Sequence, residues 1–580
     1  MTFFRLLSRS RLRLRFALLA LLFLALTAAT SHAVYTGLAA QRETVPLGQA
    51  RTIPNTDVNP YGANFFLNRE VEPWKQDKTL HMAAEAGIGW VKLHFPWEDI
   101  EPRRKGEFIH PATGTDSWAK YDHIVDLCEK YGLRIVARLD RPPAWARQDN
   151  TYQQAPPDDY ADYGDFVYEF VKRYEGRIDY IQIWNEPNIF PEWGNRPVSP
   201  EEYVQLLKVA YRRAKEANPN VYVLSAPLAF TLGEPHPEPG RWRSMNDLDY
   251  LEAMYRAGAK DYFDIFSVNA FGMGRPPEDP PDPNVLNLQR VLLQRKIMER
   301  HGDANKAVWF NEYGWNAAPD HFDKEQLIWG RVSEREQVEY TLRGIQMARE
   351  EWPWAGVFMI WYFRQVGHIP INSAEYYFRM VEPDFTPRPL YFAVQDVAHT
   401  PQEVGPGVYQ QTHPAVQTYG DWHNVIDPNA RSGSYIRSDT PGDSINFVFY
   451  GTAVDLITHR CPESGRLLVS LNGQPVPGLP VDHQGQSYVD LYSPSIQTQA
   501  RVPLVRGAAP RRNTLRITIA EEVSAGATGR ECTLDAFEVV EEERPPFPVA
   551  PLVAGLVGMS LNGWLIWRTA VRVRRTVRAP

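Results

Sequence analysis

The sequence predicts an α/β protein in which a (β/α)8 TIM barrel is followed by an all-β sandwich and a C-terminal transmembrane helix. Three observations lead to this architecture. Between residues 55 and 400, a short apolar run, a polar loop and a helical pattern recur in succession. From about residue 416 the helical patterns give way to short β-rich runs, and residues 549–567 form a mostly apolar stretch. A chain of 580 residues is long enough for several such domains.

The eight apolar runs of the barrel region share a similar length and spacing. They begin near Tyr61, Trp90, Leu133, Tyr180, Val221, Phe263, Ala307 and Gly356. Amphipathic helical patterns, such as residues 158–174 and 200–217, lie between them, and several end at Gly or Asn-Pro. Alternating strands and helices indicate parallel βαβ units, and eight units favour a (β/α)8 barrel. A doubly wound sheet is the alternative, but residues 63–66 after the first strand are no Gly-rich phosphate turn.

The region from 416 to 541 is predicted to be an antiparallel β-sandwich, joined to the barrel by a linker at residues 401–415. Its apolar runs at 444–450, 467–471 and 514–519 are separated by Gly, Pro, Asn and Asp. Four segments resemble galactose-binding-like jelly-roll modules; these are residues 438–443, 449–455, 471–474 and 534–539. The resemblance implies either a carbohydrate-binding appendage or a spacer.

Residues 1–33 are predicted to be an export signal. Five arginines precede an apolar run at residues 16–29, and Ser31-His32-Ala33 forms a small-x-small cleavage pattern. An uncleaved anchor is the alternative, but this run of 14 residues is short for a span of about 20. Residues 34–54 are predicted to be a spacer.

Residues 549–567 are predicted to cross a membrane. Nineteen residues at a rise of ~1.5 Å give roughly 28 Å, about the thickness of the hydrocarbon core. Trp564 and Trp567 suit an interfacial belt, and the arginines of residues 568–580 form a basic tail that indicates the cytoplasmic side. A docked amphipathic helix is the alternative. Together the two ends predict a single-pass protein of the cell membrane whose main body is extracytoplasmic.

Composition excludes some functions. A net charge of −8 and a pI near 6.0 give no reason to expect a nucleic-acid partner. No Cys/His cluster has the spacing of a zinc site, and neither a metal nor a cofactor is predicted. Cys461 and Cys532 could pair in an oxidising compartment, or they could be unrelated thiols.

Two strands of the predicted barrel end in glutamates. Strand four ends in Trp-Asn-Glu-Pro-Asn, which contains Glu186, and strand seven ends in Phe-Asn-Glu-Tyr-Gly-Trp, which contains Glu312. The C-terminal ends of barrel strands carry the chemistry. Two carboxylates facing each other there could stand ~5 Å apart, so that one attacks an anomeric carbon and the other protonates the leaving oxygen. Ordinary turn chemistry is the alternative for each glutamate.

The segment Trp184–Asn188 resembles the acid/base motif of glycoside hydrolase clan A, especially family 39 and parts of family 5. The resemblance covers roughly residues 55–395. It implies a retaining enzyme that cleaves O-glycosidic bonds of an extracellular or envelope polysaccharide or oligosaccharide, with Glu186 as acid/base and Glu312 as nucleophile. It also implies that Asn185 hydrogen-bonds the sugar 2-hydroxyl and that Trp361 stacks on the sugar at the cleavage point.

Strand alternation predicts further substrate contacts at the barrel mouth. Lys92 and His94 share one face of strand two, Trp145 follows strand three, and Asn269 ends strand six. Ordinary barrel packing is the alternative for each of these residues. Strand three also leads into a charged group, formed by Arg138, Asp140 and Arg141.

Two positions depart from the pattern of the relatives. Several relatives have Arg where Lys92 stands, and a lysine cannot hold a carboxylate bidentately. Many relatives have His and Tyr in the region of Phe271, which has no hydroxyl to offer Glu312. Two consequences are open: the pKa of Glu312 is shifted, or another tyrosine, such as Tyr313 or Tyr362, serves instead.

Two other functions fit the same features. One is a non-catalytic, carbohydrate-binding surface protein on a decayed barrel, and the other is a transglycosylase that remodels an envelope glycan through the same covalent intermediate. In every case the partners are a carbohydrate and the membrane. The loops at residues 190–200, 232–246 and 272–287 decide between a pocket and a groove, and therefore between exo and endo cleavage.

Overall fold

The computed structural model describes most of the chain as two compact units. The described residues are 2–41, 51–235, 242–367, 369–400, 402–509, 511–540 and 549–578. One unit comprises residues 48–540, and the other comprises residues 1–47 together with 541–580.

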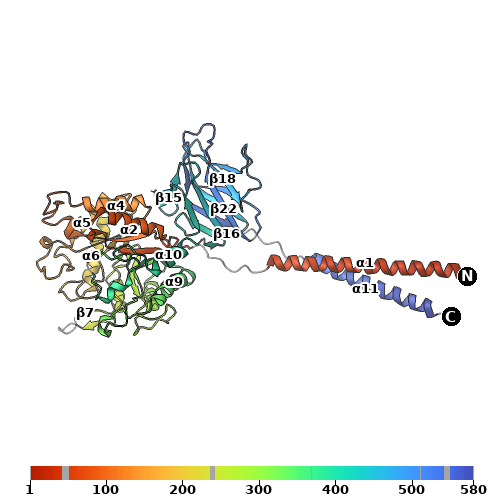
Figure 1. Cartoon of the computed structure of the whole chain (residues 1–580), viewed down its shortest axis with the longest axis horizontal. Coiled ribbons are helices and arrows are strands. Elements are labelled where there is room, and N and C mark those ends of the chain that lie inside the picture. Colours follow the sequence, from red (N-terminus) through yellow and green to blue (C-terminus); the bar gives the residue numbers. More distant parts are fainter. Residues whose placement is uncertain are drawn as a thin grey trace. The chain divides into compact units, whose positions relative to one another are not determined.

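The larger unit contains a closed barrel of parallel strands (Figure 1). These strands are β1 (Tyr61–Phe65), β2 (Trp90–Pro96), β3 (Arg134–Asp140), β4 (Tyr180–Ile183), β5 (Tyr222–Leu224), β8 (Phe266–Phe271), β9 (Val308–Gly314) and β10 (Ala355–Ile360). Their order is β5-β4-β3-β2-β1-β10-β9-β8. Parallel bridges from Leu224 to Ile265 and from Leu228 to Val268 join the two edges and close the ring. The barrel and all eight strands predicted from the sequence are confirmed.

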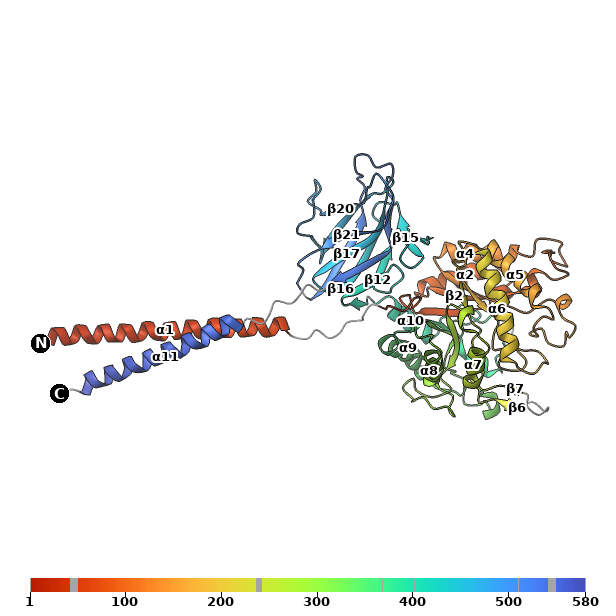
Figure 2. The ribbon, with the colours of Figure 1, turned by 180° about the vertical axis from the view of Figure 1, so that it is seen from behind.

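Helices surround the strands (Figure 2). They are α2 (Pro73–Glu85), α3 (Trp97–Ile100), α4 (Ala119–Lys130), α5 (Tyr160–Arg173), α6 (Pro200–Ala217), α7 (Asp247–Arg256), α8 (Val291–Arg300), α9 (Glu334–Glu351) and α10 (Pro389–Ala398). Short 3-10 turns connect them, among them η1 (Leu67–Arg69), η4 (Leu288–Arg290) and η6 (Ala374–Phe378). Helix α6 begins where the sequence predicts, because Ser199 caps it and Pro200 occupies its first turn.

Aromatic rings fill the barrel at the N-terminal end of its strands. Trp90 lies with its ring centroid 4.8 Å from that of Trp309 and 5.1 Å from that of Tyr180. Gly356 leaves room for this layer, since a Cβ there would lie 2.3 Å from Nε1 of Trp309. The layer closes one end of the barrel, so the polar groups described below gather at the other end, where the strands finish.

A second, all-β region follows the barrel in the same unit. Its sheets are β11-β16-β22-β18-β19, with β13 and β20 attached, then β12-β24-β17-β21 and β14-β15-β23. The strands are β11 (Glu403–Val404), β12 (Gly407–Gln410), β13 (Val416–Tyr419), β14 (His423–Ile426), β15 (Ser434–Ser438), β16 (Ser444–Tyr450), β17 (Ala453–Arg460), β18 (Arg466–Leu471), β19 (Gln474–Pro475), β20 (Tyr488–Asp490), β21 (Gln497–Val505), β22 (Arg512–Ile519), β23 (Cys532–Leu534) and β24 (Ala536–Val540). The predicted β-rich domain is confirmed.

One detail of the prediction changes, and one open alternative is decided. Residues 401–415, predicted to be a linker, contain β11 and β12, which pair with β16 and β24 and therefore belong to the sandwich. Short strands of two and four residues show too little alternation to be recognised alone. Cys461 and Cys532 are both free thiols.

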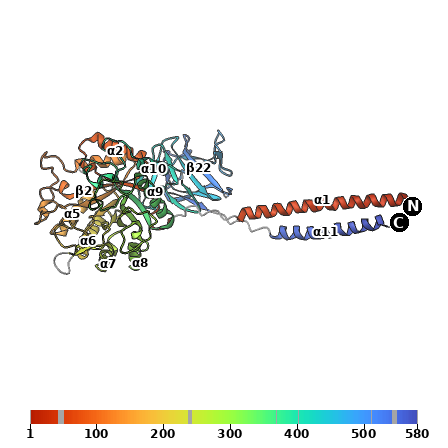
Figure 3. The same cartoon turned by 60° about the horizontal axis from the view of Figure 1, so that its bottom comes forward.

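The smaller unit consists of two long helices, α1 (Thr2–Gln41) and α11 (Val549–Arg578), which run side by side with both chain ends at the same end (Figure 3). Each contains a stretch long and apolar enough to cross a membrane, at Leu14–Tyr35 and Val549–Arg575. The first stretch has 22 residues and exceeds the run of 14 seen in the sequence, and α1 extends into the predicted spacer. The side-chain amide of Asn562 donates to the carbonyl of Leu19, at 2.9 Å.

Candidate active site

The end of β4 has an unusual backbone. Trp184 has a φ of 72° and Glu186 a φ of 41°, a region that residues other than glycine seldom adopt. The amide of Glu186 donates to the carbonyl of Pro227 at 3.0 Å, which ties this turn to the segment after β5. Such conformations are costly and concentrate at functional sites, where the surrounding structure maintains them.

The carboxylate of Glu186 lies at the mouth of the barrel. The side-chain amide of Asn269 donates to its Oε1 atom at 2.7 Å. Displacement of water by the surrounding protein raises the pKa of Glu186 to about 8, and the negative charges of Glu312 and Glu192 contribute to the shift. Glu186 is therefore largely protonated at neutral pH.

Glu312 is delivered to the same mouth by β9. It is 7% exposed, and Nζ of Lys92 lies 3.3 Å from its Oε1 atom. Burial lowers the pKa of Lys92 to about 8, against the opposing effect of the Glu312 charge. In the parallel pairing of β8 with β9, Asn269 is the register partner of Glu312. One residue thus links the two glutamates, since its backbone is adjacent to Glu312 and its side chain binds Glu186.

Several polar atoms at the mouth are buried without a hydrogen-bond partner among the described residues. They are Oδ1 of Asn185, Oδ1 of Asn269 and Nε1 of Trp361. Most buried polar atoms in folded proteins are paired, so each exception requires an explanation. Three of them around two glutamates form a set of acceptors and a donor suited to the hydroxyl groups of a ligand.

His94 belongs to a network of charges at the ends of β2 and β3. Its Nε2 atom contacts Oδ1 of Asp140, while Nε of Arg138 donates to Oδ2 of Asp140 at 2.5 Å. Burial lowers the pKa of His94 to about 4, so the ring is neutral at pH 7 and Nε2–H is the donor. Arg138 and His94 together hold the pKa of Asp140 well below its usual range, although burial opposes this.

A cavity of about 150 Å³ lies beside this network. It is lined by Asn64, Phe65, Phe66, Asn68, Arg69, Lys92, Leu93, His94, Arg138, Arg141, Trp361 and Glu375. Glu375 and Arg69 are lining residues that the sequence did not indicate. Arg69 follows shortly after β1, which is a recognisable signal, whereas Glu375 lies in η6 with no local pattern to identify it.

Burial raises the pKa of Glu375 to about 7, and the charge of Glu312 contributes to the shift. A third carboxylate therefore shares the electrostatic environment of the two predicted ones.

Not every sequence-predicted residue faces the cavity. The indole of Trp145 donates to the carbonyl of Glu101 at 2.8 Å and packs edge-on against Trp97, outside the cavity lining. The hydroxyl of Tyr313 donates to the carbonyl of Thr341, and that of Tyr362 donates to the carbonyl of Tyr376. Backbone carbonyls therefore accept both hydroxyl protons, and among the described residues neither hydroxyl donates to Glu312.

Phe271 packs instead against Phe378 and Trp329 in a small apolar cluster. Glu312 contacts Nζ of Lys92 instead.

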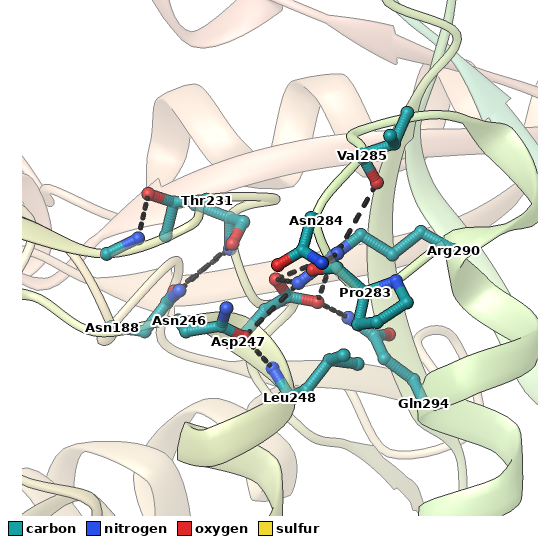
Figure 4. Close-up of polar contacts among 12 residues, drawn as sticks. Asn188, Thr231, Asn246, Asp247, Leu248, Pro283, Asn284, Val285, Arg290 and Gln294 are labelled. Atoms are coloured by element: carbon teal, nitrogen blue, oxygen red, sulfur yellow. Dashed lines mark hydrogen bonds and ion pairs between the residues drawn. The ribbon is translucent and has the colours of Figure 1, made fainter. Parts of the chain in front are cut away.

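The last residue of the strand-four motif has a supporting role (Figure 4). The side-chain amide of Asn188 donates to the carbonyls of Ala229 and Met245, and its Oδ1 atom accepts from the amide of Ala229. Asn246, next along the chain, caps α7 by accepting from the amide of Leu248. The Asn188 side chain therefore connects two segments: the turn that contains Glu186 and the start of α7.

The ion pair between Arg290 and Asp247, at the start of α7, has no exposed surface. Nε of Arg290 donates to Oδ1 of Asp247 at 2.9 Å, and the side-chain amide of Gln294 donates to Oδ2 of Asp247 at 2.7 Å. Arg290 also donates to Oδ1 of Asn246. Sequence patterns do not reveal this network, because its members come from α7, η4 and α8.

Among the described residues, no group of three or more His, Cys, Asp or Glu side chains could hold a metal ion.

No family model matches the chain. A curated relative, the Beta-glucosidase-like SFR2, chloroplastic, of Oryza sativa subsp. japonica, is 26% identical over 116 residues, which are 20% of this chain and 18% of the relative. The matched part thus spans less than a fifth of the length of that relative.

Solved structures similar to the chain include glycoside hydrolases of family 39. One, from Bacteroides cellulosilyticus WH2, is 19% identical, has a TM-score of 0.43 and covers 80% of this chain and 82% of its own. A monomeric β-xylosidase from Caulobacter crescentus CB15 is 12% identical, has a TM-score of 0.42 and covers 82% of this chain and 99% of its own. The strand order and the bridges that close the ring are the basis for assigning the barrel fold.

Proposed function

We propose that this protein is a retaining glycoside hydrolase with Glu186 as acid/base and Glu312 as nucleophile. The observation that carries the proposal is the contrast between two carboxylates linked by Asn269. Glu186 has a raised pKa, whereas Glu312 lies against the cationic Lys92. A carboxyl group that can donate a proton, beside a second carboxyl group held by a cation, is what a double displacement at an anomeric carbon requires.

The reaction follows in two steps. In the first, a carboxylate oxygen of Glu312 bonds to the anomeric carbon while the bond to the leaving oxygen breaks and Glu186 donates its proton to that oxygen. In the second, the ionised Glu186 takes a proton from water, the water oxygen bonds to the anomeric carbon, and the ester to Glu312 breaks. Glu186 regains its proton, so the protein ends as it began.

Other predicted residues bind the sugar or position the two carboxylates. The unpaired Oδ1 of Asn185 suits a sugar hydroxyl, and the indole of Trp361, which lines the cavity, suits a sugar face. Lys92 positions the nucleophile, while His94 acts through Asp140 at the edge of the cavity. Asn269 positions Glu186.

We also propose that the catalytic unit is held on the outer side of a cell membrane by α11, with the basic residues 568–580 in the cytoplasm. The support is the length and apolar character of residues 549–575 and the arginines that follow Trp567. An extracellular or envelope polysaccharide or oligosaccharide is then the substrate within reach.

The mechanism is tested on the purified full-length protein with a panel of aryl glycosides. The anomeric form of the first product, followed by proton NMR, should match that of the substrate, and a 2-fluoro glycoside should label Glu312 in a peptide map. Glu312→Ala should reduce turnover by about 10⁴-fold or more. Glu186→Ala should retain turnover of substrates whose leaving group needs no proton, and added azide should raise it.

Inverted product would overturn the retaining mechanism. Equal turnover by the wild-type protein and Glu312→Ala would remove the assignment of the nucleophile. Sugar binding without hydrolysis of any glycoside would support a non-catalytic carbohydrate-binding protein instead.

A further inference from the structure

The two terminal helices contact each other along one face of each. Residues of reduced exposure recur every three or four positions in α1, among them Leu19, Phe23, Leu26 and Thr30. They recur in the same way in α11, among them Leu552, Gly555, Met559 and Asn562. This spacing places each set on a single side of its helix. Each helix therefore presents a continuous contact face to the other.

Two polar contacts join these faces. The side-chain amide of Asn562, which is 4% exposed, donates to the carbonyl of Leu19 at 2.9 Å, and the hydroxyl of Thr27 donates to Sδ of Met559 at 3.3 Å. In a lipid bilayer no water is present to bind an asparagine side chain, so a partner on a neighbouring helix stabilises it. If α11 crossed the bilayer alone, it would expose this amide to lipid.

Glycines of α11 let the two helices approach closely. A Cβ at Gly555 would overlap Oγ1 of Thr30, and a Cβ at Gly558 would lie 3.4 Å from Cδ1 of Leu26. Small residues are typical of interfaces between transmembrane helices, because close packing drives association where lipid removes the hydrophobic driving force. The glycines and the polar contacts share one face of α11, and α1 fits that face.

The basic residues agree with an antiparallel pair of spans. Five arginines precede Phe16, and five follow Trp567. Both chain ends lie at the same end of the helix pair (Figure 3). The excess of arginine on the cytoplasmic side of membrane proteins then assigns both ends to the cytoplasm. The residues between the two helices leave the membrane together on the other side.

The length of the apolar stretch in α1 suits a span better than a cleaved signal. Its 22 residues, Leu14–Tyr35, at a rise of ~1.5 Å give roughly 33 Å, enough for a hydrocarbon core of ~30 Å. The apolar part of an export signal has about 7–15 residues. The predicted cleavage pattern, residues 31–33, lies inside this stretch and inside α1, which continues to Gln41. Cleavage there would remove the helix that covers Asn562.

We propose that α1 is retained in the mature protein as a second transmembrane helix and forms an antiparallel hairpin with α11. Both chain ends then lie in the cytoplasm, and the unit of residues 48–540 is attached to the membrane at its two ends. This inference extends the proposed membrane anchor and does not depend on glycosidase activity. It replaces the predicted cleaved signal with the uncleaved anchor, and it names α11 as the partner of that anchor.

Retention is tested by the intact mass of the full-length protein, purified from membranes that have been washed with alkaline carbonate. We expect the protein to resist the wash and its mass to include the residues before Val34. A mature chain that begins at Val34 would refute retention and leave α11 as the sole anchor. Release of the uncleaved chain by carbonate would refute the hairpin and the proposed membrane anchor together. Neither result bears on the hydrolysis of glycosides.

Pairing is tested by a disulfide cross-link in the membrane. Thr27→Cys and Met559→Cys are combined in a Cys461→Ser background and oxidised with copper phenanthroline. The matched control combines Leu24→Cys with Val557→Cys, at positions that are 64% and 61% exposed. The first pair should give at least about 10-fold more cross-link than the control, because cysteines that point apart cannot join. After cleavage at an introduced protease site between the β-sandwich and α11, cross-linked fragments should separate only in reductant.

A bulky side chain at the close approach should weaken the pairing. Gly555→Leu should reduce the yield of the Thr27–Met559 cross-link by at least about 5-fold, whereas Val557→Leu, on an exposed position, should leave it unchanged. The amount of carbonate-resistant protein shows that each variant still enters the membrane. Equal cross-linking of the inner pair and the control pair, or a yield indifferent to Gly555→Leu, would refute the hairpin.

The orientation is tested with a different epitope tag at each end of the chain. In sealed right-side-out vesicles, added protease should digest neither tag until detergent opens the membrane. Digestion of the N-terminal tag alone would place the two ends on opposite sides and would overturn the antiparallel arrangement.

Discussion

The barrel mouth and the β-sandwich each contain a cavity, and the larger one carries less chemistry. The cavity in the sandwich has about 310 Å³, against about 150 Å³ beside Glu312. Its lining is mostly small, amide and aliphatic residues, with Arg516 as the one charged side chain and no aromatic ring among the described lining residues. The cavity at the barrel mouth combines aromatic rings with five charged groups and neutral His94.

The difference teaches that ionisable groups, rather than volume, distinguish the candidate site from the other cavity. A sugar subsite needs a flat apolar face together with oriented polar groups, and the barrel mouth provides both. This contrast favours the spacer reading of the jelly-roll resemblance over a carbohydrate-binding appendage.

The largest expected effect is on stability, and it should come from breaking the ion pair between Arg290 and Asp247. Replacing Arg290 by Met leaves Asp247 buried without its cation, which should lower the free energy of unfolding by about 3–5 kcal/mol. Melting followed by tryptophan fluorescence should show the barrel transition shifted downwards. Arg516→Met is the matched control, because this exposed side chain in the sandwich should change stability by less than about 0.5 kcal/mol.

Removing the cation beside the nucleophile should have the next largest effect. Lys92→Met keeps a side chain of similar length but removes the charge that contacts Glu312. We expect kcat/KM to fall by about 100-fold, as when one preorganised electrostatic partner is lost. Lys92→Arg should recover part of the loss, and a loss below about 3-fold would contradict the positioning role.

The pH profile tests the raised pKa of Glu186. The acid must be protonated to act, so a pKa raised to about 8 keeps the active form below that pH and removes it above. For a poor leaving group, kcat/KM should fall by about tenfold per pH unit above pH 8. Lys92 also loses its proton near pH 8, and a dinitrophenyl glycoside, which needs no acid, isolates that contribution.

The smallest effect is expected in the sandwich. Arg516→Ala removes the charged side chain of its cavity and should change kcat/KM on soluble aryl glycosides by less than about twofold. Binding of polysaccharide to this variant, measured by affinity electrophoresis, should equal that of the wild-type protein. If the variant lost the mobility shift that polysaccharide causes in the wild-type protein, the sandwich would be a carbohydrate-binding module.

Patterns local in the chain predicted most of the fold. The eight barrel strands and α6 follow from apolar runs, helical periodicity and capping residues such as Ser199, which act within a few residues of one another. Short elements are different. Strands β11 and β12 are held by their partners β16 and β24, and nothing in their own residues distinguishes them from a linker.

The site divides in the same way. Strand position and motif identified Glu186, Glu312 and Lys92, because a strand end in a barrel has a defined place and each of these residues is close to one. Arg69 and Glu375 come from connecting segments whose paths depend on packing, and the Arg290–Asp247 pair joins segments more than 40 residues apart. The sequence by itself therefore determined the barrel, the two carboxylates proposed to be catalytic and the apolar terminal helices. Tertiary structure alone decided which charges share a cavity, because electrostatic energy depends on distance in space and not along the chain.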